Sequence, residues 1–265
     1  MTPPRLVYAA NRRIGARGLA VLREHGWTPV GLLVPDAPVA EHVDDLVRAC
    51  PEVPVLGASA LRAPEGLARL RDLAPDYFLS VHYPHIVPPE ALALPSIGAL
   101  NLHPAFLPFN RGWHTPSWAI LDGTPYGATL HWMAAETDTG DVALQRPLEV
   151  RPEDTADSLY ERVVDLELEV LREAVPLLVR RSLGRTPQDP DGTLHRKRDL
   201  AAVRRLDLGE RVPVGRVLDR LRALTTSRRD EAAYFEHGGA RYRVRVEIER
   251  EEAGRERAVD DEPST

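Results

Sequence analysis

The sequence has a single cysteine and lacks the patterns that direct a chain into or across a membrane. A disulfide framework needs pairs of cysteines, so one residue, Cys50, excludes it and favours a reducing cytoplasm. The first residues do not form a basic segment followed by an apolar one, and no run approaches about eighteen apolar residues. We therefore expect a cytoplasmic protein that makes no use of a membrane.

An excess of basic residues is also missing. The chain has 34 Lys and Arg against 40 Asp and Glu, which gives a formal net charge of -6. This balance argues against a general nucleic-acid binder and leaves only a local basic patch open. The length of 265 residues suffices for one full domain and a small second one.

Two familiar catalytic and cofactor motifs are absent as well. Where a dinucleotide-binding chain would have GxGxxG after its first strand, this one has Asn11-Arg-Arg-Ile-Gly15, which disfavours a dinucleotide cofactor. Ser117, in the stretch TPSWA, lacks the flanking glycines of a GxSxG elbow. The chemistry is therefore not expected to run through an acyl-serine intermediate.

What the first 180 residues do contain is an alternation of strand and helix patterns. Apolar runs predict strands at 5–10, 29–34, 53–56, 76–81, 97–102 and 127–133. Helical spacing predicts helices at 16–25, 41–50, 61–73 and 155–179. This order predicts an α/β fold with a doubly wound, mostly parallel sheet that binds its ligands beyond the carboxyl ends of the strands.

A turn-rich stretch, LGRTPQDPDG, predicts a boundary after the α/β region. We divide the chain into a first domain (1–183), a small C-terminal helix-plus-hairpin segment (193–249) and a disordered tail (250–265). In the segment we expect a helix at 214–224 and strands at 232–236 and 241–248, joined at the His237-Gly-Gly-Ala240 turn. Alternation on the second strand gives one apolar face, which must pack on its own domain or on a second subunit; we predict a homodimer.

Three polar residues stand where strands end. Asn101 and His103 alternate with apolar neighbours, so they share one side of their strand, and Asp138 follows a later strand. Each alone is best explained as a structural residue: a loop cap, a partly buried histidine and a turn acid. Together, an amide, an imidazole and a carboxylate can stabilise an oxyanion and move a proton during acyl transfer to a nucleophile that the substrate brings.

These residues and their flanks resemble the folate-dependent formyltransferase superfamily. The shared pattern is Asn-x-His in NLHPAFLPFNRG, the histidine of the strand GATLHWM, and Asp-x-Gly in DTGDV. The loop NRGWHTPSWAI is most similar to the sugar-nucleotide N-formyltransferase branch. The resemblance implies that 10-formyltetrahydrofolate is the donor and that Asn101, His103 and Asp138 are catalytic. It leaves His131 either functional or structural.

The resemblance also implies binding residues for the two substrates. It assigns the folate to four residues of the loops HYPHIVP and DTGDV: Tyr83, His85, Ile86 and Asp141. It makes Trp113 and His114 candidates for the acceptor side, and the charge of the run with Arg196 and Lys197 makes those two candidates for the pyrophosphate. Trp113 also suits a packing role in its loop, and a solvated face is the more common meaning of a basic run such as the one that includes Arg196. A cation pair there suits the phosphate oxygens of a nucleotide.

The acceptor implied by the resemblance is the amine of an amino-deoxysugar on a nucleoside diphosphate, with thymidine diphosphate as the carrier. Methionyl-tRNA formyltransferases are longer and have a basic face for tRNA, which this acidic chain does not suit. Three alternatives stay open: another small amine as acceptor, water (a formyltetrahydrofolate hydrolase), and a sensor of folate or nucleotide sugar that has no activity. No metal is expected, because the histidines lack companion carboxylates at ligand spacing.

Overall fold

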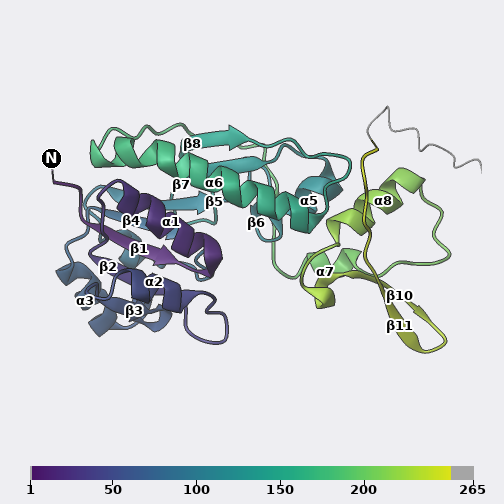
Figure 1. Cartoon of the computed structure of the whole chain (residues 1–265), viewed down its shortest axis with the longest axis horizontal. Coiled ribbons are helices and arrows are strands. Elements are labelled where there is room, and N and C mark those ends of the chain that lie inside the picture. The colour runs from purple at the N-terminus through teal and green to yellow at the C-terminus, as the bar shows by residue number, and fades with distance from the viewer. Residues whose placement is uncertain (1, 252–265) are drawn as a thin grey trace, which may run out of the picture.

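A seven-stranded sheet forms one end of the molecule, and a small C-terminal segment extends from the other end (Figure 1). This computed structural model describes residues 2–251. The strands lie in the order β3 (Val55–Gly57), β2 (Gly31–Val34), β1 (Leu6–Ala10), β4 (Tyr77–Val81), β5 (Gly98–His103), β7 (Gly127–Trp132) and β8 (Val142–Pro147). The first five are parallel, whereas β7 is antiparallel to β5 and β8 is antiparallel to β7. The predicted doubly wound, mostly parallel sheet is confirmed.

Helices cover both faces of this sheet because its strands are apolar on both sides. One face carries α1 (Arg12–Glu24), α2 (Val43–Ala49) and α6 (Ala156–Val179). The other carries the 3-10 turn η1 (Ala58–Leu61), α3 (Pro64–Asp72) and α4 (Pro89–Leu92). Alternation along β1 shows the division: Leu6 and Tyr8 pack in the core below α1 and α6, and Val7 packs in the core below α3.

The long helix α6 begins at a capping box. The Thr155 hydroxyl accepts the backbone N–H of Ser158, and the Ser158 side chain accepts the backbone N–H of Thr155. From there the helix runs over α1, β5 and β7 (Figure 1). Its buried stripe brings one charged residue, Glu167, to the carboxyl edge of the sheet, where that residue is fully buried.

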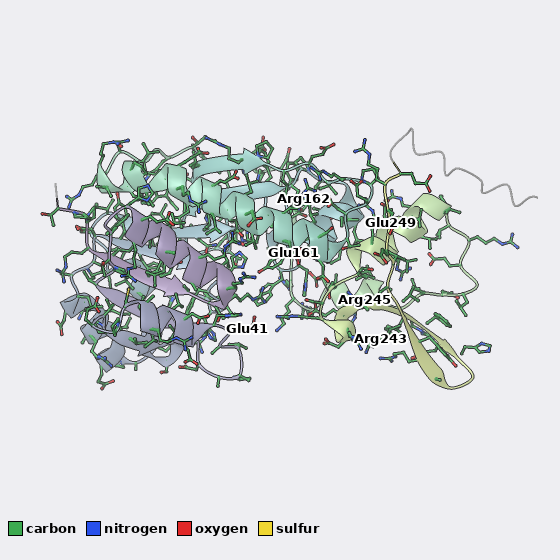
Figure 2. The ribbon with its side chains drawn as sticks, viewed as in Figure 1. Glu41, Glu161, Arg162, Arg243, Arg245 and Glu249 are labelled. Atoms are coloured by element: carbon green, nitrogen blue, oxygen red, sulfur yellow. The ribbon has the colours of Figure 1, made fainter. Side chains whose placement is uncertain are left out.

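The C-terminal segment packs on α5 (Thr115–Asp122), a helix that the sequence patterns did not predict. It comprises α7 (Leu200–Val203), α8 (Val214–Ala223), η2 (Arg229–Glu231), β10 (Ala233–His237) and β11 (Ala240–Val244). Trp118 of α5 joins Leu200, Leu224 and Ala233 in a small separate core. At the rim, Glu41 faces the segment (Figure 2), with one carboxylate oxygen 3.9 Å from Arg228.

The predicted hairpin is present, but its second strand is shorter than predicted. Gly238 and Gly239 form the two-residue turn, both with positive φ, as the hairpin signal requires. Val244 pairs with Ala233, where β10 begins, so no partner strand exists beyond it. Past this point the backbone N–H of Val246 bonds instead to the Thr225 hydroxyl, at 3.1 Å.

Other differences from the sequence predictions are local. The strand β8 was not predicted, and the helix expected from residue 61 begins at Pro64 after the 3-10 turn. The predicted tail falls almost entirely outside the described residues, which end at 251. Within residues 2–251 no helix combines the length and the apolarity that crossing a bilayer requires.

Candidate active site

The site is built at the carboxyl end of β5. Asn101 and His103 alternate on this strand, and the neighbouring strand β7 places His131 directly opposite Asn101. His103 and His131 are buried, and their rings meet edge to face with centroids 6.2 Å apart. Alternation therefore does put the amide and the imidazole on one side, as the sequence predicts, and β7 adds a second imidazole.

Asp138 closes the cluster from the loop between β7 and β8. One carboxylate oxygen lies 3.4 Å from the Asn101 amide nitrogen and 3.4 Å from His131 Nε2. The other accepts the backbone N–H of Gly112 at 2.9 Å and lies 3.5 Å from His103 Nε2. The structure thus brings together the three residues predicted to be catalytic, two from the strand β5 and one from the loop between β7 and β8.

The hydrogen-bond pattern defines what each group can donate. His131 Nδ1 donates to the Trp132 carbonyl at 2.9 Å, which leaves Nε2 to accept from the Asn101 amide nitrogen at 3.2 Å. His103 Nε2 faces both the Asn110 carbonyl, at 3.4 Å, and the carboxylate of Asp138. His131 therefore orients the amide of Asn101, a contact that the sequence pattern could not resolve from a purely structural role.

Burial and charge oppose one another in this cluster. Burial lowers the pKa of His103, and the nearby Asp138 carboxylate offsets part of that effect. Burial alone would raise the pKa of Asp138, but His103, His131 and the N–H of Gly112 outweigh it and hold that pKa well below its usual range. At neutral pH the site thus contains an ionised carboxylate beside a neutral imidazole.

The stretch that the sequence predicts as a boundary is a strap, residues 184–195, which crosses both loops of the site. At its start, Thr186 pairs with Val142 through two backbone hydrogen bonds of 2.8 and 2.9 Å. At its end, β9 (Leu194–His195) pairs with β6 (Arg111–Gly112), beside the Gly112 N–H that binds Asp138. The strap, which links the first domain to the C-terminal segment, is therefore bound to both loops of the site.

The predicted donor residues divide into two groups. Tyr83 and His85 lie side by side in the loop after β4, with ring centroids 5.4 Å apart, and Ile86 next to them is 76% exposed. The Tyr83 hydroxyl and His85 Nε2 are buried without a hydrogen-bond partner among residues 2–251. Asp141 lies at the start of β8, where its carbonyl accepts the backbone N–H of Trp132. An exposed apolar side chain and two unsatisfied polar atoms suit a loop that binds a ligand.

A buried polar network at the base of this loop was not predicted from the sequence. His82 Nε2 lies 2.8 Å from the Glu167 carboxylate, and its Nδ1 lies 3.1 Å from the Tyr160 hydroxyl. Arg12 donates to the same hydroxyl at 3.3 Å. Glu167 and Tyr160 belong to α6, so this network fixes the loop to the helix. Only a charged residue on the buried stripe of α6 signals it in the sequence.

The predicted acceptor residues gather where the strap enters the C-terminal segment. Lys197 Nζ lies 5.1 Å from the centre of the Trp113 ring, within the range of a cation–π contact. His114 Nδ1 lies 3.7 Å from the Glu231 carboxylate, which brings the segment against the loop. Arg196 is exposed, and its backbone N–H bonds to Asp199. These contacts join the two parts of the chain but leave the cationic ends of Arg196 and Lys197 accessible.

Among residues 2–251 there is no group of three or more His, Cys, Asp or Glu side chains placed to hold a metal ion. His103 and His131 share the carboxylate of Asp138, whereas His82 pairs with Glu167 on the other side of β5. Ser117 is buried in α5. The chemistry that this cluster can perform is therefore that of its amide, imidazoles and carboxylate.

Two family models match the chain. Residues 34–175, just over half of its length, match the formyl transferase model. Residues 199–250 match the N-formyltransferase dimerization C-terminal domain. The gap between the two matches contains the strap.

Curated relatives match at the level of sequence. The chain is 34% identical to a dTDP-4-amino-4,6-dideoxyglucose formyltransferase of Mycobacterium tuberculosis, over 66% of this chain and 74% of the relative. It is also 34% identical to a methionyl-tRNA formyltransferase of Myxococcus xanthus, over 72% of this chain and 64% of the relative.

Solved structures share the fold over nearly the whole chain. A sugar N-formyltransferase from Shewanella has a TM-score of 0.81 at 20% identity, covering 94% of this chain and 99% of the other. An N-formyltransferase from Helicobacter canadensis, solved with folinic acid and dTDP-3-aminofucose, has a TM-score of 0.66 at 16% identity, covering 89% and 85%. At these identities the likeness shows a common architecture.

Proposed function

This chain belongs to the formyl transferase family, and from that premise we propose that it moves a formyl group from 10-formyltetrahydrofolate to the amine of a dTDP-linked amino-deoxysugar. The observation that carries the proposal is the cluster of Asn101, His103 and Asp138 in a chain so similar to an enzyme acting on such a sugar. The donor side is supported by the structural relative that was solved with a folate and a dTDP-sugar.

The C-terminal segment favours the sugar over tRNA as acceptor. The chain matches only 64% of the methionyl-tRNA relative, and its own segment matches a dimerization domain of N-formyltransferases instead. The net charge of -6 also gives no general attraction for RNA. The same segment supports our proposal that the enzyme is a homodimer.

The reaction needs an oxyanion to be stabilised. When the sugar amine attacks the formyl carbon, the carbonyl oxygen gains negative charge in a tetrahedral intermediate. His103 and Asn101 are the proposed donors to that oxygen. Of the two Asn101 amide hydrogens, one faces Asp138 and the other faces His131 Nε2. The second is the one that can turn to the oxyanion, because the first is held by the ionised carboxylate of Asp138.

The reaction also needs one proton to be moved. The attacking nitrogen becomes positively charged as its bond to carbon forms, and the leaving N10 of the folate must gain a proton as its own bond to carbon breaks. Asp138, held ionised beside neutral His103, is placed to orient the imidazole that carries the proton. No net charge accumulates, because the proton lost by the amine ends on the folate nitrogen.

A panel of acceptors tests this proposal. The purified protein is incubated with 10-formyltetrahydrofolate and, in separate reactions, dTDP-linked 3-amino and 4-amino sugars, free amino sugars, methionyl-tRNA or no acceptor. Mass spectrometry should show a gain of one formyl group on a dTDP-sugar only. Formate release without acceptor would identify a hydrolase, formylmethionyl-tRNA would identify the tRNA enzyme, and binding without turnover would identify a sensor. Each of those three results would contradict the proposal.

A further inference from the structure

The backbone at Asp138 has a left-handed conformation that sets the direction of its carboxylate. Its φ is 55°, in a region that, apart from glycine, mainly asparagine and aspartate adopt. This conformation is what lets one carboxylate reach Gly112, His103, His131 and Asn101 at once. If the backbone relaxed, those distances would change together.

Gln188 supports this conformation from the strap. Its amide nitrogen donates to the Asp138 carbonyl at 2.9 Å and to the Gly140 carbonyl at 2.7 Å, so both hydrogens are used on one turn. Its own carbonyl oxygen is buried and has no hydrogen-bond partner among residues 2–251. The amide is thus oriented by the two bonds that it donates, and the turn between β7 and β8 is bound on its outer side.

The strap is fixed firmly enough to hold this amide in place. Two residues before Gln188, the backbone of Thr186 is paired with Val142. One residue earlier, the Arg185 guanidinium stacks 3.6 Å above the Trp132 ring, while Trp132 Nε1 donates to the Gly184 carbonyl at 2.9 Å. Trp132 ends β7, so the strap and the turn are attached to the same strand.

We propose that Gln188 is a positioning residue for the transfer reaction, and that its two amide hydrogen bonds hold Asp138 in the left-handed turn that aims its carboxylate at His103. The role of Asp138 in catalysis rests on the function proposed above. The position of its carboxylate beside His103 does not depend on that function. The hydrogen bonds of Gln188 reach the backbone of the turn, so its loss should lower kcat and leave both KM values nearly unchanged.

Two substitutions separate this role from a general effect on stability. Gln188→Met keeps the size of the side chain but cannot donate, so the turn relaxes, and kcat should fall about tenfold to a hundredfold. In Gln188→Glu, the ionised carboxylate at high pH cannot donate to the two carbonyl oxygens that it faces. When the carboxyl group is protonated, it can donate one hydrogen bond to them. The ratio of its kcat to that of Gln188→Met should therefore rise as the pH is lowered from 8 to 6. Thr186→Ala is the matched control, because Thr186 contributes to the strap through its backbone.

A second readout needs no substrate. The groups that influence the charge of His103 are Asp138, His131, His82 and the Asn110 carbonyl. If Asp138 moves away in Gln188→Met, its stabilising effect on the imidazolium is lost, and the His103 pKa measured by proton NMR should fall below that of the wild type. The His103 resonance is assigned with a His103→Gln variant.

These measurements decide the proposal even if the acceptor has been assigned wrongly. It is overturned if Gln188→Met keeps the wild-type pKa of His103, or if it raises KM with kcat unchanged. It is equally overturned if Thr186→Ala loses as much turnover as Gln188→Met, or if the variant's melting temperature falls enough to explain the loss. A lower pKa of His103 together with a lower kcat, in a protein that melts like the wild type, supports it.

Discussion

At the scale of single residues, His103 and Asp138 face each other across 3.5 Å, and one must stay neutral while the other stays charged. His103→Ala and Asp138→Asn should each lower turnover by at least about a hundredfold, the effect typical of losing a proton-transfer group or an oxyanion donor. Formyl transfer to the preferred acceptor is measured in purified protein, with circular dichroism to confirm folding. His25→Ala, at an exposed histidine that caps the C-terminal end of α1, is the control. Near-normal turnover in either site variant would refute the roles given to these residues.

The low pKa of His103 also makes a prediction about stability. Burial holds this pKa below the value of 6.5 that the side chain has when unfolded. The unfolded chain therefore binds a proton at this site before the native one does, so the contribution is present above pH 6.5 and is lost as the pH falls toward the native value. Asp138 stays ionised throughout that window, because its pKa lies far lower.

Urea denaturation of the wild type and of His103→Gln, at intervals between pH 8 and pH 5, measures this effect. The wild type should lose unfolding free energy relative to the variant as the pH falls. Other groups that titrate in this range are common to both proteins and cancel in the difference. A difference that stays constant with pH would mean that His103 has the same pKa in both states.

At the scale of elements, α6 and the loop after β4 are joined by the hydrogen bond between His82 and Glu167. Both side chains are buried, and burial raises the pKa of Glu167. Glu167→Ala should cost about 3 kcal/mol, because it leaves the imidazole without its buried partner. Glu169→Ala, an exposed glutamate on the same helix, should change the unfolding free energy by less than about 0.5 kcal/mol. Chemical denaturation compares the two, and equal losses would contradict the importance of the pair.

The elements that could be predicted from sequence are those with strong apolar patterns. The buried strands β1, β2, β4 and β5 and the long helix α6 follow their patterns to within a few residues. The helix α5 was missed because it begins with Thr115-Pro-Ser after a turn-rich loop, and nearly all of its side chains are buried, so it has no polar face to mark a helical period. The strand β8 is half-exposed at the sheet edge and ends in a proline, which weakens its pattern.

The site was partly predictable for a related reason. Asn101 and His103 lie on one strand, so alternation relates them directly, and Asp138 is recognisable from its motif. Contacts between segments that are far apart in the chain produce no repeating pattern in the sequence. The bonds from Gln188 to the turn of Asp138 span about fifty residues, and the pairing of Glu167 with His82 spans 85. Such partners become visible only when the fold brings them together. The binding roles given to eight residues stay predictions: Tyr83, His85, Ile86, Asp141, Trp113, His114, Arg196 and Lys197.

At the scale of the whole molecule, the C-terminal segment exposes several large apolar side chains. Val214 and Leu218, one turn apart on α8, are 73% and 46% exposed, and Tyr242 on β11 is 47% exposed while it stacks on Phe235. Such a surface suits the dimerization domain that this segment matches. The predicted face of the hairpin is thus only partly covered by its own chain.

Leu218→Asp should therefore shift the protein from dimer to monomer, because a charge cannot be desolvated at an apolar interface without a large cost. Light scattering after size-exclusion chromatography measures the mass at several concentrations. Val39→Asp places the same charge on a half-exposed valine of the first domain and should leave the dimer intact. A dimer that persists in Leu218→Asp, or a wild type that is monomeric, would refute this interface.

The strap also has a consequence for the order in which the protein acquires its activity during synthesis. Asn101, His103 and Asp138 leave the ribosome well before Gln188 does, and domains generally fold as their residues emerge. Through that interval the nascent chain can build its sheet, yet the turn of Asp138 lacks the two bonds that hold it. The last step of assembly therefore adds the two bonds that hold the turn of Asp138, after the sheet and α6 that surround it have been synthesised.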